Sequence, residues 1–327
     1  MELYVSGGRQ RRQLAGEVAP EWSLYDRARI VRIDTESLRS ETVVDYETPP
    51  EARPDEGYSI LFKQGALDDR TLYICTSTEV LIFSTPEFTQ TGYVSLPTFN
   101  DLHHVCPGAP GSLLVASTGL DMVVECTATG EPLRQWSVIG ENPWERFSQG
   151  TDYRKLATTK PHKSHPNFVF HLNGDIWVTR AWQKDALCLT CPERRFSVGT
   201  ETIHDGLVIG DSIWFTSVDG KVIEVDRGSL EVKRSVDLNG IDSKPDTVLG
   251  WCRGLCPVGD HLTWVGFTRV RKTKFRENLL WVKHRFSNPD VPTHIALYDL
   301  DGRKCLQEID LEERGLNVVF SIFAVAL

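Results

Sequence analysis

Short apolar runs rich in β-branched and aromatic residues recur along the chain, separated by turns that contain Gly, Asp, Asn or Pro. Few segments place apolar residues at the spacing of an amphipathic helix. Apolar runs of this length, bounded by such turn residues, are typical of β-strands. The pattern therefore predicts an all-β protein.

The strand pattern repeats as a unit. Each unit begins with an apolar strand, continues through a glycine-containing turn into a second strand, and then reaches a turn with Gly or Asp. Five nearly complete four-strand units can be aligned, at residues 58–97, 104–138, 167–198, 204–238, and 253–267 continued by 293–311. Repeats of this length are typical of the blades of a β-propeller.

A further blade is expected to combine both ends of the chain. The segments MELYVSGG, ARIVRIDTES and SETVVDYE supply three strands, and NVVFSIFAVAL supplies a strand that lacks a partner. Pairing it with the N-terminal blade closes the ring and removes open sheet edges. We therefore predict one domain over residues 1–327, a six-bladed β-propeller whose C-terminal strand closes the N-terminal blade. The alternatives are seven blades, or a pair of β-sandwiches.

Two insertions are too long for simple connections between blades. Residues 138–166 carry aromatic and basic side chains, and we expect this loop over the channel mouth, either packed on itself or covering a substrate. Residues 268–292 are strongly basic and include FRENLLWVKHRF, a candidate amphipathic helix or flap. This second insertion could be a solvated flap, a lid that steers an anionic substrate, or a docking patch at residues 269–285 for an acidic protein partner or nucleic acid.

Composition narrows the class of protein. With 40% hydrophobic and 25% charged residues among 327, the chain is an ordinary globular sequence, which excludes disordered and collagen-like classes. A net charge of −9 makes nucleic acid an unlikely partner. No segment approaches the roughly 18 apolar residues of a membrane span, and the N-terminus has no apolar signal region. We therefore expect a cytoplasmic protein with no membrane partner, in which the eight cysteines are reduced.

The repeat predicts where a site would lie. In a propeller the first strand of each blade lines the central channel, so equivalent positions converge there. Counting back eight residues from the start of the second strand in four blades selects His104, Asn167, His204 and Arg253. With more error in the alignment, the corresponding positions in the other two blades are Tyr58 and Asn317.

These residue types suggest chemistry on a small anionic or polar metabolite. Histidines can act as general acid and base near neutral pH, and an arginine can clamp a carboxylate, sulfate or phosphate. We predict His104, His204 and His165 as catalytic residues, Arg253 as the anion clamp and Asn167 as an orienting donor. Further candidates for substrate binding are His103, Tyr58, Asn317, Arg154 and Lys160. The reaction would be that of a lyase, isomerase or cyclase, hydrolase or group transferase, and its cofactor is unknown.

Two other interpretations stay open. His104, His165 and His204 could instead ligate zinc or iron, since neutral imidazoles suit these transition metals. The pair His162-x-x-His165 adds little to this, because spacing within a loop does not define geometry. The protein could also be a non-catalytic scaffold that binds a protein partner, with histidines that only hold the blades together.

Two of the units also suggest a family. HHVCPGAPGSLLVASTGLDMVVECTATGEPLRQWSV and HPNFVFHLNGDIWVTR resemble the blades of arylsulfotransferase-like propellers, and gluconolactonase-like and strictosidine-synthase-like propellers share the general blade plan. The resemblance covers about a fifth of the chain. It implies a channel histidine that acts as nucleophile or acid–base, with basic residues that hold a sulfuryl group. His104, His165 and Asn167 are the matching positions.

Overall fold

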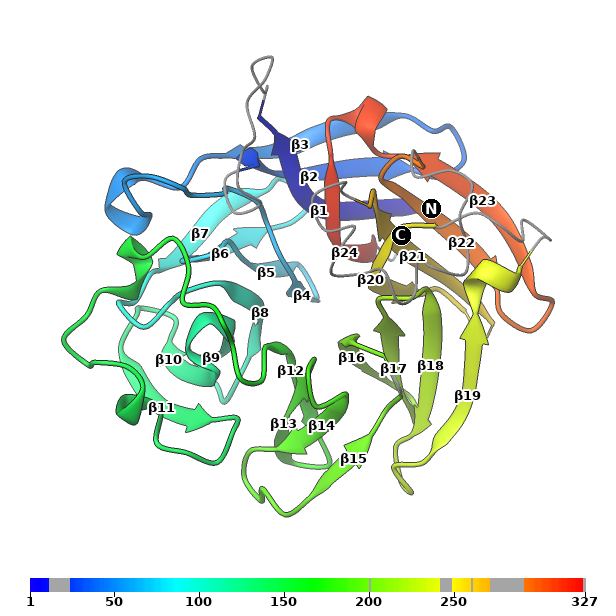
Figure 1. Ribbon diagram of the computed structural model, residues 1–327. Coiled ribbons are helices and arrows are strands. Elements are labelled where there is room, and N and C mark those ends of the chain that lie inside the picture. Colours follow the sequence, from blue (N-terminus) through cyan, green and yellow to red (C-terminus); the bar gives the residue numbers. More distant parts are fainter. Residues whose placement is uncertain (12–23, 200, 242–248, 260, 271–290, 326–327) are drawn as a thin grey trace.

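Six four-stranded antiparallel sheets stand around a central channel in the computed structural model of the protein (Figure 1). The structure describes residues 1–11, 24–199, 201–241, 249–259, 261–270 and 291–325. The predicted six-bladed β-propeller is confirmed, and the seven-bladed alternative is wrong for the described chain. None of the helices in the described ranges has the length and hydropathy needed to cross a membrane.

We number the blades in chain order and give their strands from the channel outward. Blade 1 contains β24 (Val318–Val325), β1 (Glu2–Gln10), β2 (Tyr25–Asp34) and β3 (Ser40–Tyr46). Blade 2 contains β4 (Gly65–Asp68), β5 (Thr71–Cys75), β6 (Val80–Ser84) and β7 (Thr89–Val94). Blade 3 contains β8 (Leu102–Pro107), β9 (Ser112–Ser117), β10 (Met122–Thr127) and β11 (Pro132–Ser137).

The remaining blades follow the same order. Blade 4 contains β12 (Pro166–Leu172), β13 (Asp175–Arg180), β14 (Asp185–Cys188) and β15 (Arg195–Ser197). Blade 5 contains β16 (Ile203–Ile209), β17 (Ser212–Ser217), β18 (Lys221–Asp226) and β19 (Val232–Asp237). Blade 6 contains β20 (Trp251–Pro257), β21 (Leu262–Thr268), β22 (His294–Asp299) and β23 (Lys304–Asp310). The short 3₁₀ helices are η2 (Pro50–Ala52), η3 (Thr118–Leu120), η4 (Pro143–Glu145), η5 (Tyr153–Lys155), η6 (Leu238–Gly240) and η8 (Glu312–Arg314).

The C-terminal strand closes the ring, as predicted. β24 is the innermost strand of blade 1 and pairs antiparallel with β1, with Ile322 opposite Val5 (Figure 1, red beside dark blue). The junction is reinforced just before β24, where the Asn317 side chain accepts a hydrogen bond of 2.8 Å from the backbone N–H of Gln10. Strands from opposite ends of the chain therefore share one sheet.

The hydrophobic core lies between the blades. Every residue of β17 is buried, because the middle strands are covered by a neighbouring blade on each face. Most residues of the outer strand β19 are exposed or half-buried. The main apolar clusters fall one between each pair of adjacent blades, which explains why the middle strands read as continuous apolar runs in the sequence.

Five of the six innermost strands carry a β-bulge within their first four residues, whereas β4 pairs with β5 without one. A bulge leaves a residue without a partner on the next strand and re-aims its side chain. The positions skipped in the pairing are His103, Asn167, Gly206, Arg253 with Gly254, and Phe320. Gly254 has φ +80°, and a Cβ there would lie 2.8 Å from the carbonyl oxygen of Phe320, so this bulge requires glycine.

These bulges correct the register assumed from the sequence. His104 pairs with Ala116 and His204 with Thr216, at matching positions in their blades. Asn167 and Arg253 are instead bulge residues, which the count of eight residues could not distinguish.

The register also differs in the other two blades. Tyr58 lies before β4, the inner strand of blade 2. The residue opposite the end of β5 is Lys63, because its backbone N–H donates a hydrogen bond of 2.8 Å to the Cys75 carbonyl. Asn317 lies just before β24, where Ser321 is opposite Ser6. In these two blades the chain before the inner strand, β4 or β24, is irregular, so the count of eight residues selects a position before the strand rather than within it.

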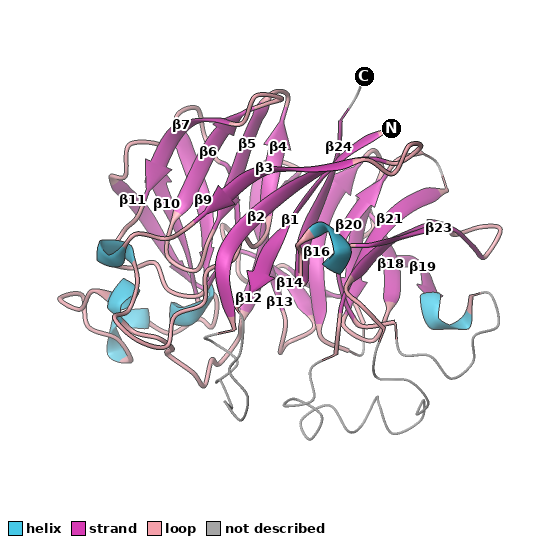
Figure 2. Ribbon diagram, turned by 90° about the horizontal axis from the view of Figure 1, so that it is seen from above, coloured by secondary structure: helices cyan, strands magenta, loops and turns pink. Residues whose placement is uncertain are grey.

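The first insertion joins β11 to β12 and contains η4 and η5, on the lower side of the ring in Figure 2. Of the second insertion, the structure describes only residues 268–270 and 291–292. The predicted amphipathic helix and the docking patch at 269–285 therefore lie almost wholly outside the described residues.

Candidate functional site

A cavity of about 220 Å³ opens at the end of the channel where the inner strands begin. We call it the mouth pocket. Its lining comes from blades 1, 2, 3 and 6 and from the loop between β11 and β12. The predicted site residues that line it are Tyr58, His103, Lys160, His165 and Arg253.

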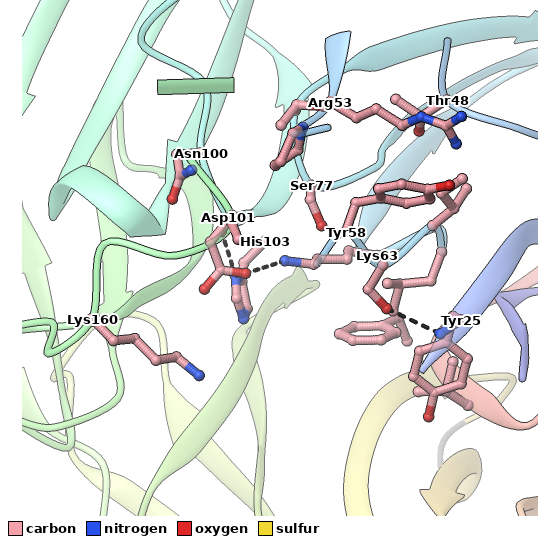
Figure 3. A pocket seen from close by; sticks show the side chains of 18 of the residues that line it. Tyr25, Thr48, Arg53, Tyr58, Lys63, Ser77, Asn100, Asp101, His103 and Lys160 are labelled. Carbon is pink, nitrogen blue, oxygen red and sulfur yellow. Dashed lines mark hydrogen bonds and ion pairs between the residues drawn. The ribbon is translucent and has the colours of Figure 1, made fainter. Parts of the chain in front are cut away.

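Asp101 lies at the centre of the polar side of this pocket (Figure 3). The ammonium group of Lys63, which is buried, forms an ion pair with the Asp101 carboxylate. His103 Nδ1 donates a hydrogen bond of 2.8 Å to the Asp101 backbone carbonyl. Burial opposes ionisation, but the ammonium group of Lys63 holds the pKa of Asp101 well below its usual range. Asp101 is therefore a carboxylate at neutral pH.

Three histidines cluster beside this carboxylate. His162 Nδ1 and His165 Nδ1 are 3.0 Å apart, and the rings of His103 and His165 meet edge to face with centroids 4.6 Å apart. Burial lowers the pKa of His165 to about 3 and, together with the charge of Lys63, lowers the pKa of His103 well below its usual value. These rings are consequently neutral imidazoles near pH 7, able to accept a hydrogen bond or to ligate a metal.

The backbone of the His165 loop is held by Asp121. This carboxylate, only 1% exposed, accepts hydrogen bonds from the N–H groups of Lys163 at 2.8 Å and of Ser164 and His165 at 2.9 Å. Asp121 also forms an ion pair of 2.7 Å with Arg146. His165 has φ 62°, a left-handed conformation that a residue with a side chain adopts at a cost. Asp121 therefore positions His165.

The other side of the pocket is aromatic and cationic. The Arg253 guanidinium lies 4.5 Å from the centroid of the Phe320 ring, and the Arg53 guanidinium 4.0 Å from that of Tyr58. Lys160 is exposed and directs its ammonium group toward the same space in Figure 3. The pocket thus combines cations, flat apolar surfaces and neutral imidazoles.

A second cavity, of about 530 Å³, occupies the opposite end of the channel. It is lined mainly by apolar side chains and by strand backbone, including Phe168, Phe170 and Leu255. Its described lining contains no lysine or arginine. Although this cavity is larger, the convergent charged groups lie in the mouth pocket, which is therefore the stronger candidate site.

His104 belongs to the second cavity rather than to the mouth pocket. Its ring stacks on Phe168 at 3.6 Å, and its Nδ1 accepts a hydrogen bond of 3.3 Å from the Val169 N–H. Burial lowers the pKa of His104 to about 3. These contacts connect blade 3 to blade 4.

His204 and Asn167 line neither cavity. Burial, then the charge of Arg253, lowers the pKa of His204 well below its usual value. The Asn167 amide donates to the Ile203 carbonyl over 2.8 Å, which links blade 4 to blade 5. The structure therefore separates His104, Asn167, His204 and Arg253, and Arg253 alone of the four reaches the mouth pocket.

Arg154 and Asn317 also lie away from the lining of the mouth pocket. Arg154 forms an ion pair of 2.7 Å with Asp152 and donates to the Ser95 carbonyl over 3.2 Å. Asn317 supports the closure of the ring.

Several residues of the site were not predicted from the sequence: Arg53, Lys63, Asp101, Trp251 and Phe320, which line the pocket, and His162, which lies beside it. Asp101 lies between two aligned units. Lys63 lies inside the unit 58–97, but five residues after Tyr58, the position that the register selected. The His162-x-x-His165 spacing was a usable signal, since both rings meet in the structure. Among the described residues, the group able to hold a metal is Asp101 with His162 and His165, whose ligand atoms lie within 4.8 Å of one another. The predicted trio of His104, His165 and His204 is divided, because His104 faces the other end of the channel.

Comparisons with known proteins identify the fold alone. No family model and no curated protein sequence matches this chain. A protein of unknown function from Bacteroides caccae superposes with a TM-score of 0.62 over 98% of this chain and 97% of its own, at 12% sequence identity.

Two other solved structures superpose less well on this chain. One is a streptogramin B lyase, with a TM-score of 0.49 and 13% identity over 95% of this chain and 88% of its own. The other is a chain of a mitotic checkpoint complex, with a TM-score of 0.49 and 8% identity over 93% and 83%. Beyond the propeller fold, the resemblance to arylsulfotransferase-like, gluconolactonase-like and strictosidine-synthase-like propellers stays a prediction.

Proposed function

We propose that this propeller binds a small anionic metabolite in the mouth pocket and acts on it by proton transfer. The observation that carries the proposal is convergence: Lys63, Lys160 and Arg253 come from separate parts of the chain and line one cavity with two histidines. Side chains brought together over such sequence distances are typical of ligand sites.

The charge of the pocket favours an anion. Four basic side chains line it with a single carboxylate, Asp101, although the whole chain has a net charge of −9: Arg53, Lys63, Lys160 and Arg253. Of these, Lys63 pairs with Asp101, and Arg53 pairs with Glu47, outside the lining, at 3.3 Å. A local positive potential in an acidic protein attracts anionic ligands and orients them. A guanidinium can bind a carboxylate, phosphate or sulfate group through two parallel hydrogen bonds.

The aromatic rings indicate the rest of the ligand. Tyr58 and Phe320 each lie beneath a guanidinium, and Trp251 lines the same cavity. These rings offer flat apolar surface next to the cations. The fitting ligand is therefore a small molecule with an anionic group attached to a planar or apolar part.

His103 is the candidate base. Its Nδ1–H donates to the Asp101 carbonyl, so Nε2 carries the free lone pair of the neutral ring. Burial and the charge of Lys63 lower the pKa of His103. A bound anion would offset that positive charge, so the neutral Nε2 could then accept a proton from a hydroxyl or an acidic carbon of the bound molecule. Such a step begins many lyase, isomerase and cyclase reactions.

Anion binding tests the proposal. We would titrate the protein calorimetrically with sulfate, phosphate and a set of small mono- and dicarboxylates, and compare Arg253→Gln and Lys160→Gln with the wild type. At least one anion should bind, and each substitution should weaken it by about tenfold or more, since a charge-assisted hydrogen bond contributes roughly 1.5–3 kcal/mol.

Arg154→Gln is the matched control, because Arg154 is bound to Asp152 outside the pocket lining and its loss should leave the affinity unchanged. A wild type that binds none of these anions, or an Arg253→Gln variant that binds them equally well, would refute the proposal.

A further inference from the structure

Asp101, His162 and His165 form a compact group of metal-binding side chains at the floor of the mouth pocket. Their ligand atoms, one from each residue, lie within 4.8 Å of one another. Ligand atoms around a tetrahedral zinc ion, at about 2.0–2.1 Å from the metal, are separated by roughly 3.4 Å. Small shifts of these side chains would therefore bring all three into coordination distance.

Contacts within the protein hold this group in place. The His162 side chain is only 1% exposed, and the loop that carries His165 is fixed through three backbone hydrogen bonds to Asp121. Asp101 and His165 both adopt left-handed backbone conformations, with φ 49° and 62°. A site whose ligands are held by surrounding contacts loses less entropy when a metal binds.

We infer that Asp101, His162 and His165 bind one divalent transition-metal ion of the zinc or iron(II) class. Two imidazoles and one carboxylate form the ligand set that such ions accept, whereas calcium and magnesium prefer oxygen ligands alone. Lys63 occupies Oδ1 of Asp101, so the carboxylate would bind the ion through Oδ2.

The ion would face the ligand cavity. Asp101 and His165 line the mouth pocket, while His162 approaches from behind. Three protein ligands leave at least one coordination position open on the pocket side, as in catalytic rather than structural zinc sites. The inference deepens the proposed function and rests on it for the ion's role, since the ion would contact the same bound anion. Metal binding itself can be measured without that anion.

The test uses Co²⁺ as the probe, because its visible absorption reports the ligands and the coordination number. Protein dialysed against a chelator is titrated with CoCl₂ and with MgCl₂, and the melting temperature is recorded with and without Co²⁺. We expect one Co²⁺ per chain, an absorption spectrum of a four- or five-coordinate ion, a rise in melting temperature and no response to Mg²⁺.

The variants locate the site. His162→Ala and His165→Ala should each weaken Co²⁺ binding about 100-fold and abolish the rise in melting temperature. Asp121→Asn should weaken it about 10- to 100-fold, as expected for a residue that positions a ligand. His171→Ala removes an imidazole at the opposite end of the channel and should change neither readout.

Co²⁺ binding and anion binding are measured separately, so the metal site and the proposed function can be refuted independently. Wild type that binds no Co²⁺, or His162→Ala and His165→Ala variants that bind it normally, would overturn the metal site even if anions bind. If a histidine variant does not fold, the spectrum and stoichiometry of the wild type still decide, since a six-coordinate aqua-ion spectrum would contradict the site. Loss of anion binding with intact Co²⁺ binding would overturn only the proposed function.

Discussion

Asp205 is a carboxyl group enclosed within the channel. It accepts hydrogen bonds from Thr216 Oγ1 at 2.5 Å and from Gln64 Nε2 at 2.7 Å, and it is 2% exposed. Burial raises its pKa to about 6 in spite of these donors. The unfolded chain would ionise this group near pH 3.8, so the folded protein holds the proton over a wider range.

Asp205→Asn should therefore alter the pH dependence of stability. Because the folded pKa is raised, the contribution of Asp205 is fully present below about pH 3.9 and is lost as the pH rises through about 6. Relative to the variant, the wild type should lose up to about 3 kcal/mol between pH 4 and pH 8. Urea unfolding of both proteins across this range measures the difference. A difference that stays constant with pH would contradict the raised pKa.

At the scale of elements, the loop between β11 and β12 depends on one buried side chain. Asp121 accepts three backbone N–H groups from residues 163–165 and binds Arg146. Asparagine has one acceptor oxygen and no charge, so it cannot satisfy all four donors. The loop should consequently be less stable in Asp121→Asn than in the wild type.

We expect Asp121→Asn to cost about 2–3 kcal/mol, because it leaves buried donors unsatisfied. Hydrogen exchange at residues 160–166 should accelerate, and urea unfolding should shift in parallel. Asp152→Asn is the control on the same loop. Asp152 is 33% exposed and pairs with Arg154, so its loss should cost under about 1 kcal/mol. Equal effects of the two substitutions would show that Asp121 does not support the loop.

The strands and their bulges explain which site residues could be recognised from the sequence. Alternating and continuous apolar runs locate the strands, and His103, His165 and Arg253 are recognisable near their starts. The bulges are invisible to such a pattern, because one extra residue changes which side chain turns toward the mouth. His104 and Arg253 occupied equivalent positions in the sequence alignment, yet they face opposite ends of the channel.

At the scale of the whole molecule, stability depends on the closure of the ring. β24 buries Val319 and Ile322 against blades 1 and 6 and pairs along β1. Removing residues 318–327 would expose the edge of β1 and open one apolar core. The shortened chain should lose cooperative thermal unfolding or should associate, as measured by circular dichroism and size-exclusion chromatography.

Leu306→Asp is the control for this deletion. Leu306 is 51% exposed on the outermost strand of blade 6, and its substitution should change stability by less than about 0.5 kcal/mol. A shortened chain that melts like the wild type would show that closure contributes little.

The sequence by itself determined the class of fold, the order of the blades and their closure. The fold class and the order of the blades follow from local pattern, since the period of apolar residues and the positions of turn residues define strands wherever they occur. Closure was predicted because NVVFSIFAVAL supplies a strand that lacks a partner, and an open sheet edge is unfavourable. The tertiary structure decided the site. Lys63, Asp101 and His162 come from separate lead-in segments and loops, and they meet because bulges, left-handed residues and the hydrogen bonds of Asp121 direct the chain there. Contacts of this kind join residues far apart in the sequence, and no local pattern encodes them.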